Sequence, residues 1–105
     1  MKILVNIVAA TSLIIAGGAI ATEMPALAKK NACTACHAID KKVVGPAWKA
    51  VAEKYKGDAG APAYLSNKIT KGGSGVWGKA TMPPNTKISE ADKKELIGFI
   101  LGLTK

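Results

Sequence analysis

Apolar residues recur at helical spacing in three segments of the chain, and a fourth segment is rich in strong helix formers. The spacing predicts one helix opened by Pro46 and ended by Gly57, and a shorter one that starts at Pro62 and stops at Gly72. A further helix is expected over residues 26–32, after Pro25, and should carry the chain into Cys33. In the helices that start at Pro46 and at Pro62, the positions expected to face the core are Trp48, Val51, Ala52, Tyr55, Leu65 and Ile69.

The last helix has a clear start signal. Ser89 is a typical N-cap residue, and Asp92 follows three residues later, which is a weaker form of the capping box. The apolar stripe expected on this helix comprises Leu96, Phe99, Ile100 and Leu103.

Residues 73–88 are expected to be non-helical. Their glycines and the pair Pro83-Pro84 break both helical and strand patterns, and a loop of this length in a small domain indicates a functional segment. The run Gly73 to Gly78 matches the Gly-x-Gly-x-x-Gly spacing of dinucleotide-binding turns, but it follows a helix rather than a strand and so lacks their context. No strand is recognisable, and the sequence predicts an all-α fold.

The first 21 residues have the organisation of a secretory signal peptide. Lys2 supplies the charged start, an apolar run follows from Ile3 to Ile20, and Ala19-Ile20-Ala21 is a small-x-small cleavage site. The alternative is an uncleaved membrane anchor, because the apolar run is close to the ~20 residues that a spanning helix needs. We expect cleavage, which leaves one domain over residues 22–105 with no stable membrane insertion.

Composition limits what this small domain can do alone. After residue 21 only five aromatic residues remain, so a large flat apolar cofactor would supply core that the sequence lacks. The chain has a formal net charge of +8, with its lysines dispersed rather than gathered in a long block. Most of these lysines fit an ordinary solvated surface, although together they could steer an acidic protein partner, and export argues against nucleic acid.

The run Cys33-Thr34-Ala35-Cys36-His37 is the main candidate for chemistry. Cys-x-x-Cys-His is the attachment site of c-type haem, in which two thiols bind the haem covalently and the imidazole of the histidine can ligate the iron. A zinc site is less favoured, because the chain offers only three of the four soft ligands that zinc normally takes. A dithiol redox motif also remains open, although no strand pattern precedes Cys33.

If His37 takes one axial position on the iron, a methionine is the candidate for the other. Met24 and Met82 are the only methionines after residue 21, and His37 is the only histidine. Met24 lies nine residues before Cys33, from where the opposite haem face is hard to reach, whereas Met82 lies in the long loop that could wrap around the cofactor. The alternative for Met82 is that it fills a gap in the core.

Taken together, these stretches make the chain resemble a class I cytochrome c, and more narrowly the short bacterial monohaem cytochromes of the periplasm. The resemblance covers essentially all of residues 22–105 and rests on four stretches in this order: Cys33 to Asp40, Val44 to Ala47, Gly75 to Gly78, and Met82 to Asn85. It implies a small fold of about four helices wrapped around one covalently bound haem c.

The resemblance also implies roles for four further residues. The Pro46 carbonyl would accept the proton on the far nitrogen of His37, the Trp77 indole N–H would bond a haem propionate, and the Asn85 amide would orient the methionine sulfur. Their alternatives are a helix start, a packed core aromatic and a simple turn. Lys68 stands where close relatives often carry an arginine near a propionate, and lysine lacks the planar fork of arginine.

The expected function is one-electron transfer by a soluble periplasmic carrier, which is not an enzyme. The resemblance implies redox partners such as a nitrite reductase, a terminal oxidase or a quinol-oxidising complex, docking through acidic faces onto lysines such as Lys30, Lys41 and Lys79. We expect a monomer. The alternatives are a haem peroxidase or gas sensor with a labile methionine ligand and, less favoured, a thiol oxidoreductase.

Overall fold

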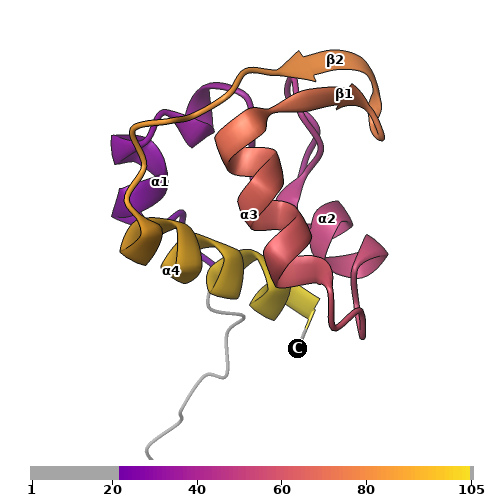
Figure 1. The fold of residues 1–105 in the computed structure, drawn as a ribbon. Helices are drawn as coiled ribbons and strands as arrows, with labels where there is room; N and C mark the ends of the chain where they lie inside the picture. Colours follow the sequence, from indigo (N-terminus) through magenta and orange to yellow (C-terminus); the bar gives the residue numbers. More distant parts are fainter. Residues whose placement is uncertain (1–21, 105) are drawn as a thin grey trace, which may run out of the picture.

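The computed structural model describes residues 22–104, so the expected signal peptide and its cleavage site lie outside the described residues. The helices are α1 (Ala26–Lys30), α2 (Trp48–Lys54), α3 (Ala61–Lys71) and α4 (Glu90–Leu101), as Figure 1 shows. Two short 3-10 turns, Cys33–Ala35 and Gly102–Thr104, and the strands β1 (Gly73–Gly75) and β2 (Gly78–Met82) complete the fold. In this part of the chain no helix combines the length and the apolar character needed to cross a membrane.

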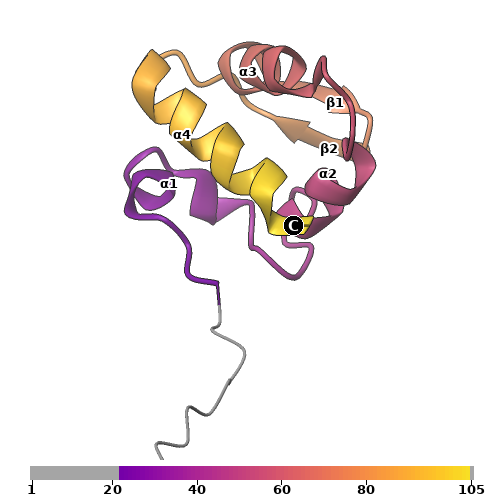
Figure 2. The ribbon, with the colours of Figure 1, turned by 90° about the horizontal axis from the view of Figure 1, so that it is seen from below.

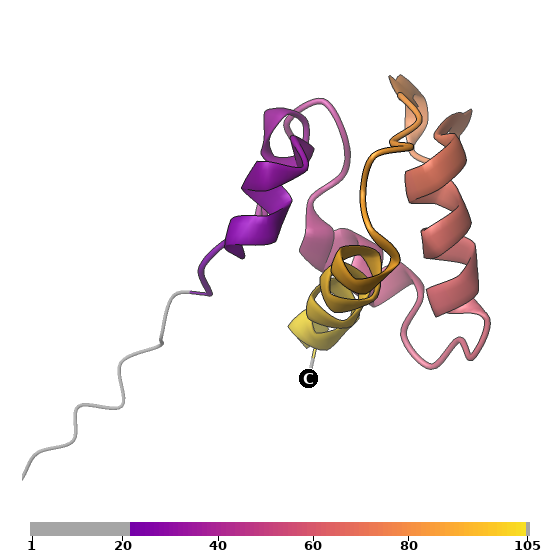
Figure 3. The same cartoon turned by 60° about the vertical axis from the view of Figure 1, so that its left-hand side comes forward.

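The C-terminal helix α4 packs against each of the other three helices, and α1 and the hairpin lie on opposite sides of it (Figures 2 and 3). It begins as predicted, because the Ser89 hydroxyl accepts a hydrogen bond from the Asp92 backbone N–H at 3.1 Å. The buried side chains of α4 are mainly apolar and join those of α2 and α3 in one core. The predicted helical domain is therefore confirmed in its main elements.

The prediction of no strand is wrong at one place. β1 and β2 pair in an antiparallel hairpin, with Gly73 opposite Met82 and Gly75 opposite Gly78. The glycines that break strand patterns are what make this hairpin possible, because Gly75 (φ +96°) and Gly78 (φ +103°) adopt backbone angles that other residues rarely take. The Gly-x-Gly-x-x-Gly run is thus a hairpin around Trp77.

The first helix is shorter than predicted. α1 ends at Lys30, and Ala32 has a left-handed backbone (φ +62°), so the helix does not continue into Cys33. The chain instead makes a separate 3-10 turn over Cys33–Ala35. Good helix formers extend to Ala32, but the chain must turn here to present the two cysteines.

A buried lysine that the apolar pattern did not predict links α3 to α4. Lys93 is only 6 % exposed, and its ammonium group lies 2.9 Å from the Thr70 hydroxyl and 2.8 Å from a Glu90 carboxylate oxygen. A buried ammonium needs such partners, because an unpaired charge in the core is costly. The aliphatic stem of Lys93 therefore packs within the helix interface while its head is satisfied.

Candidate functional site

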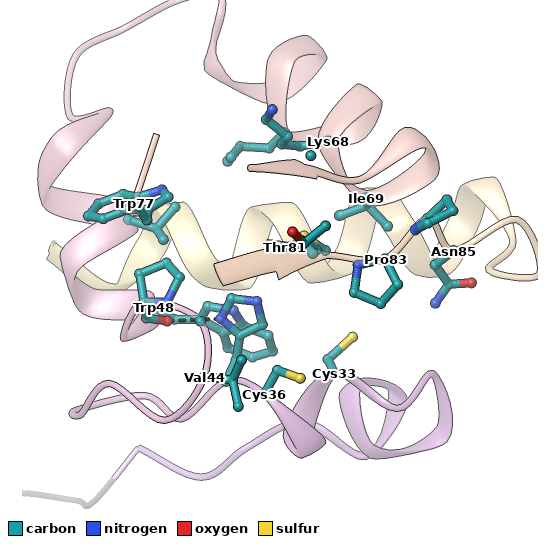
Figure 4. Close-up of a pocket in the computed structure, with 18 of the residues that line it drawn as sticks. Cys33, Cys36, Val44, Trp48, Lys68, Ile69, Trp77, Thr81, Pro83 and Asn85 are labelled. Carbon is teal, nitrogen blue, oxygen red and sulfur yellow. Dashed lines mark hydrogen bonds between the residues drawn. The ribbon is translucent and has the colours of Figure 1, made fainter. Parts of the chain in front are cut away.

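A cavity of about 390 Å³ lies between α3, the hairpin and the segment that follows α1, within the range typical of cofactor sites. Figure 4 shows Cys33 and Cys36 pointing into it from one segment, with Thr81 and Pro83 on the strand and loop above them. Its apolar lining comes mainly from Val44, Trp48, Val51, Leu65, Ile69, Leu96 and Ile100. The core of the domain is thus open at the place where an apolar ligand would fit.

Both cysteines of the motif line this cavity as free, half-buried thiols. The backbone N–H groups of Cys36 and His37 both donate to the Cys33 carbonyl, at 3.2 and 3.0 Å, so the motif forms one tight turn. Burial raises the pKa of the Cys33 thiol, although a hydrogen bond from its own backbone to the sulfur opposes part of this effect. Among residues 22–104 no group of three or more His, Cys, Asp or Glu side chains is arranged to hold a metal ion.

The imidazole of His37 is fixed in orientation by three neighbours. Its Nδ1 lies 2.8 Å from the Pro46 carbonyl oxygen, and its ring stacks on Trp48 with centroids 5.7 Å apart. Because a carbonyl only accepts hydrogen bonds, Nδ1 carries a proton, and in the neutral imidazole Nε2 therefore has the free lone pair. Gly45 lies against the ring, since a Cβ there would be 2.6 Å from Cε1.

Of the two candidate methionines, only Met82 lines the cavity. It ends β2, and the following residues Pro83 and Pro84 line the cavity with it. Met24 is partly buried and packs against the core elsewhere. The Met82 backbone is closely confined, because a Cβ on Gly72 would lie 2.2 Å from the Met82 carbonyl oxygen. The structure therefore brings Met82 and His37 to one cavity and leaves Met24 outside it.

Asn85 also lines the cavity, and its side chain is held by three hydrogen bonds. Its Oδ1 accepts from the backbone N–H groups of Lys87 and Ile88, both at 3.2 Å, and its Nδ2 donates to the Asn31 carbonyl at 3.2 Å. The two bonds from Oδ1 to the backbone of the next residues are those of a turn, the alternative role considered for Asn85 from the sequence. The three bonds together use one of the two amide hydrogens and leave the other available.

Lys68 and Trp77 lie at one end of the cavity, together with residues that the sequence did not single out for this site. The Lys68 ammonium lies 5.7 Å from the centroid of the Tyr64 ring, and the Lys54 ammonium lies 5.7 Å from that of Trp77. Tyr55 and Tyr64 pack with ring centroids 5.4 Å apart. Burial, followed by a hydrogen bond to Tyr64 and nearby negative charge, raises the pKa of Tyr55 to about 12. Of these residues, Tyr55, Tyr64, Lys68 and Trp77 line the cavity and Lys54 lies outside the lining, so Lys68 is the one that brings a positive charge to this end.

The residues of the cavity fit a haem. Two thiols on one turn, an imidazole with a free Nε2 and an apolar wall match a covalently attached, flat, hydrophobic cofactor with one nitrogen ligand. The positive charge of Lys68 in the lining suits the carboxylate groups that such a cofactor carries. Among residues 22–104, no buried side-chain nitrogen or oxygen lacks a hydrogen-bond partner, so no unpaired polar atom disfavours an apolar cofactor in this cavity.

Comparisons with known proteins agree with this reading. The cytochrome c family model matches residues 21–104. The chain is 52 % identical over 95 residues to cytochrome c-552 of Nitrosomonas europaea, covering 90 % of each chain, and 47 % identical over 92 residues to cytochrome c-551 of Pseudomonas aeruginosa, covering 88 % of each. The crystal structure of the Nitrosomonas europaea cytochrome c552 superimposes with a TM-score of 0.70 at 55 % identity, over 73 % of this chain and 95 % of that one.

These matches set aside the zinc and dithiol alternatives and confirm the resemblance. The matched range includes the whole cavity and the Cys-x-x-Cys-His motif, so the motif and the fold point to the same cofactor. The chain belongs to the cytochrome c family, as a class I monohaem electron carrier of the c-551/c-552 type that is not an enzyme and that holds one haem c covalently through Cys33 and Cys36.

Proposed function

We propose that this protein carries electrons between redox proteins of the periplasm, with His37 and Met82 as the two axial ligands of its haem iron. The observation that supports this most directly is that one cavity is lined by the Nε2-free imidazole and by the Met82 thioether. When bound, the haem supplies a one-electron couple between ferric and ferrous iron. Two protein ligands fill both axial positions and raise the reduction potential, which suits electron transfer.

Four residues around the ligands have supporting roles in this proposal. Pro46 holds the tautomer and orientation of His37, because its carbonyl accepts from Nδ1 at 2.8 Å. Asn85 would donate its remaining amide hydrogen to the Met82 sulfur. Trp77 and Lys68, which both line the cavity, would bind the haem propionates.

Location and partners follow from the charge and from the N-terminal sequence. Cleavage after Ala21 would release the domain into the periplasm, and the cytochrome c family match begins at residue 21. The exposed large apolar residues include Val43, Val44, Val76 and Trp77, and Lys41 and Lys79 lie close to them in the sequence; we take these six residues as the docking surface. Within residues 22–104 neither lysine makes an ion pair, whereas Lys30 pairs with Asp92 at 3.5 Å.

We assign the weak docking of acidic faces of a nitrite reductase, terminal oxidase or quinol-oxidising complex to this surface. Lys41→Glu and Lys79→Glu should slow electron transfer to such a partner at low salt. Lys49→Glu, which alters a lysine paired with Asp40, is the matched control. Unchanged kinetics in the first two variants would contradict the assignment.

The axial ligation is tested on protein made in a host that exports and matures c-type cytochromes. A haem-sized gain in denatured mass is the loading control for every variant. The ferric protein should show the weak far-red absorption band of methionine sulfur bound to iron. Met82→Ala should lose this band, and Met24→Ala should keep it. A band lost in Met24→Ala alone would overturn the assignment, and a wild-type protein that lacks the band and binds carbon monoxide rapidly would favour the gas-sensor alternative.

A further inference from the structure

Asn31 lies at the junction of three parts of the fold. It is the C-cap residue of α1, two positions before Cys33, and its side chain is half-buried. Its Nδ2 donates to the Leu27 carbonyl at 2.8 Å and to the Asp92 carboxylate at 3.3 Å. Figures 1 and 2 show α1 beside α4, so these two bonds fix Asn31 between the end of one helix and the first turn of the other.

The backbone carbonyl of Asn31 is directed towards the other side of the site. It accepts the Asn85 amide at 3.2 Å, and the Cys33 sulfur lies 3.8 Å from it. Asn85 is in turn attached to α3, because its backbone N–H donates to the Ile69 carbonyl at 2.9 Å. The segment that follows the hairpin is therefore attached to both α1 and α3 through one residue.

Asn85 is connected to Met82 by a stiff link. Pro83 and Pro84 separate the two residues, and each proline has a backbone φ restricted to about −65° and no N–H of its own. A displacement of Asn85 is therefore transmitted to Met82 rather than absorbed between them. Gly72 also confines this link, because a Cβ on Gly72 would clash with the Met82 carbonyl oxygen and with the backbone of Pro83 and Pro84.

We propose that Asn31 is a positioning residue for Met82, acting through Asn85 and the two prolines. The side chain of Asn31 places its own carbonyl, the carbonyl holds the Asn85 amide, and Asn85 sets where Met82 stands in the cavity. This inference rests on the proposed ligation of iron by Met82. It differs from a purely structural role, because it predicts a change at the Met82 ligand that exceeds any change in global stability.

The test compares the wild-type holo-protein in its ferric state with five variants. Added imidazole competes with Met82 for the iron, and the loss of the far-red band measures its apparent affinity. Asn31→Ala removes the two side-chain hydrogen bonds, so imidazole should bind roughly five- to tenfold more tightly, as expected for the loss of about one net hydrogen bond. Lys30→Ala removes only the exposed ion pair to the same Asp92, and should change the affinity less than about twofold.

Ile97→Val separates positioning from stability. Ile97 is buried in α4 and does not line the cavity, so this variant lowers global stability without touching the Asn31 contacts. Its imidazole affinity should stay near the wild-type value. Reversing the polar pair, with Asn31→Asp and Asp92→Asn together, should recover part of the affinity change seen with Asn31→Asp alone.

Two results would overturn the proposal. One is an Asn31→Ala protein that binds imidazole as the wild type does. The other is an equal rise in affinity for Asn31→Ala and Ile97→Val, which would make Asn31 a structural residue only. In both cases the far-red band of the wild-type protein would still support Met82 as an iron ligand. A wild type that lacks the band would instead overturn the ligation itself, and this inference with it.

Discussion

Substitution of Gly45 by alanine tests the packing that orients His37. A Cβ at this position would lie 2.6 Å from the imidazole Cε1 and 3.0 Å from each ring nitrogen. Carbon atoms in contact are normally about 3.5–4.0 Å apart, so the ring or the backbone must move by about 1 Å. Gly45 is held in place, because its N–H donates to the Cys36 carbonyl at 2.8 Å.

The energetic effect combines two contributions. Overpacking of a fixed interior typically costs about 1–3 kcal/mol. A ring displacement of this size also weakens the hydrogen bond from Nδ1 to the Pro46 carbonyl, which contributes about 1 kcal/mol. The free energy of unfolding of Gly45→Ala should therefore fall by about 2–4 kcal/mol, and the midpoint of thermal unfolding should fall by about 10–30 °C.

The assay is thermal unfolding of the haem-loaded protein followed by circular dichroism, together with its visible spectrum. Gly98→Ala is the matched control, because Gly98 lies inside α4 with no atom near its added Cβ. This control should be about as stable as the wild type or up to about 1 kcal/mol more stable, since alanine favours the helix. A Gly45→Ala protein that unfolds at the wild-type temperature would show that the ring is not confined in this way.

Two further predictions concern the backbone at Ala32 and the ionisation of Tyr55. Ala32→Gly should raise the free energy of unfolding by about 1 kcal/mol, because glycine adopts the left-handed angle without a Cβ clash. The control Ala50→Gly, inside α2, should lower it by a similar amount. Chemical denaturation measures both, and an Ala32→Gly protein less stable than the wild type would refute the explanation. The pKa of Tyr55 is raised from 10 to about 12 in the folded state, so the stability gained from its neutral form is present below pH 10 and is lost as the pH rises towards 12. Denaturation curves between pH 9 and about 12 should therefore show a smaller loss of stability in Tyr55→Phe than in the wild type, and equal losses would contradict the raised pKa.

The sequence was sufficient to predict the helices and the covalent attachment site. α2, α3 and α4 follow from apolar spacing and from punctuation by proline, glycine and Ser89, all of which are local signals. The Cys-x-x-Cys-His run is equally local, and it identified the cofactor before any fold was known. Met82 could be preferred over Met24 because only the long loop offered a path to the far side of the cofactor.

Features that depend on contacts between distant segments were not predictable in the same way. The hairpin was missed, because its glycines remove the side-chain alternation that identifies strands. Asn31 carried no signal, since its importance comes from Asp92 and Asn85, more than fifty positions away. In the sequence, Gly45 stood out only as part of the stretch from Val44 to Ala47 that resembles the cytochrome family. The structure shows why glycine is needed there, because the His37 ring leaves no room for a side chain.

The cavity has a consequence for when the chain becomes a folded protein. The apolar side chains that line the cavity pack against one another in the core, but the atoms that face the cavity gain contacts only when the haem is attached, and a domain this small has few other contacts to compensate. Attachment should therefore complete the fold: a newly made chain remains accessible to proteases until both thioethers form, and is more stably folded afterwards. Cells that lack haem should therefore accumulate little of this polypeptide, because proteases degrade the chains to which no haem has been attached.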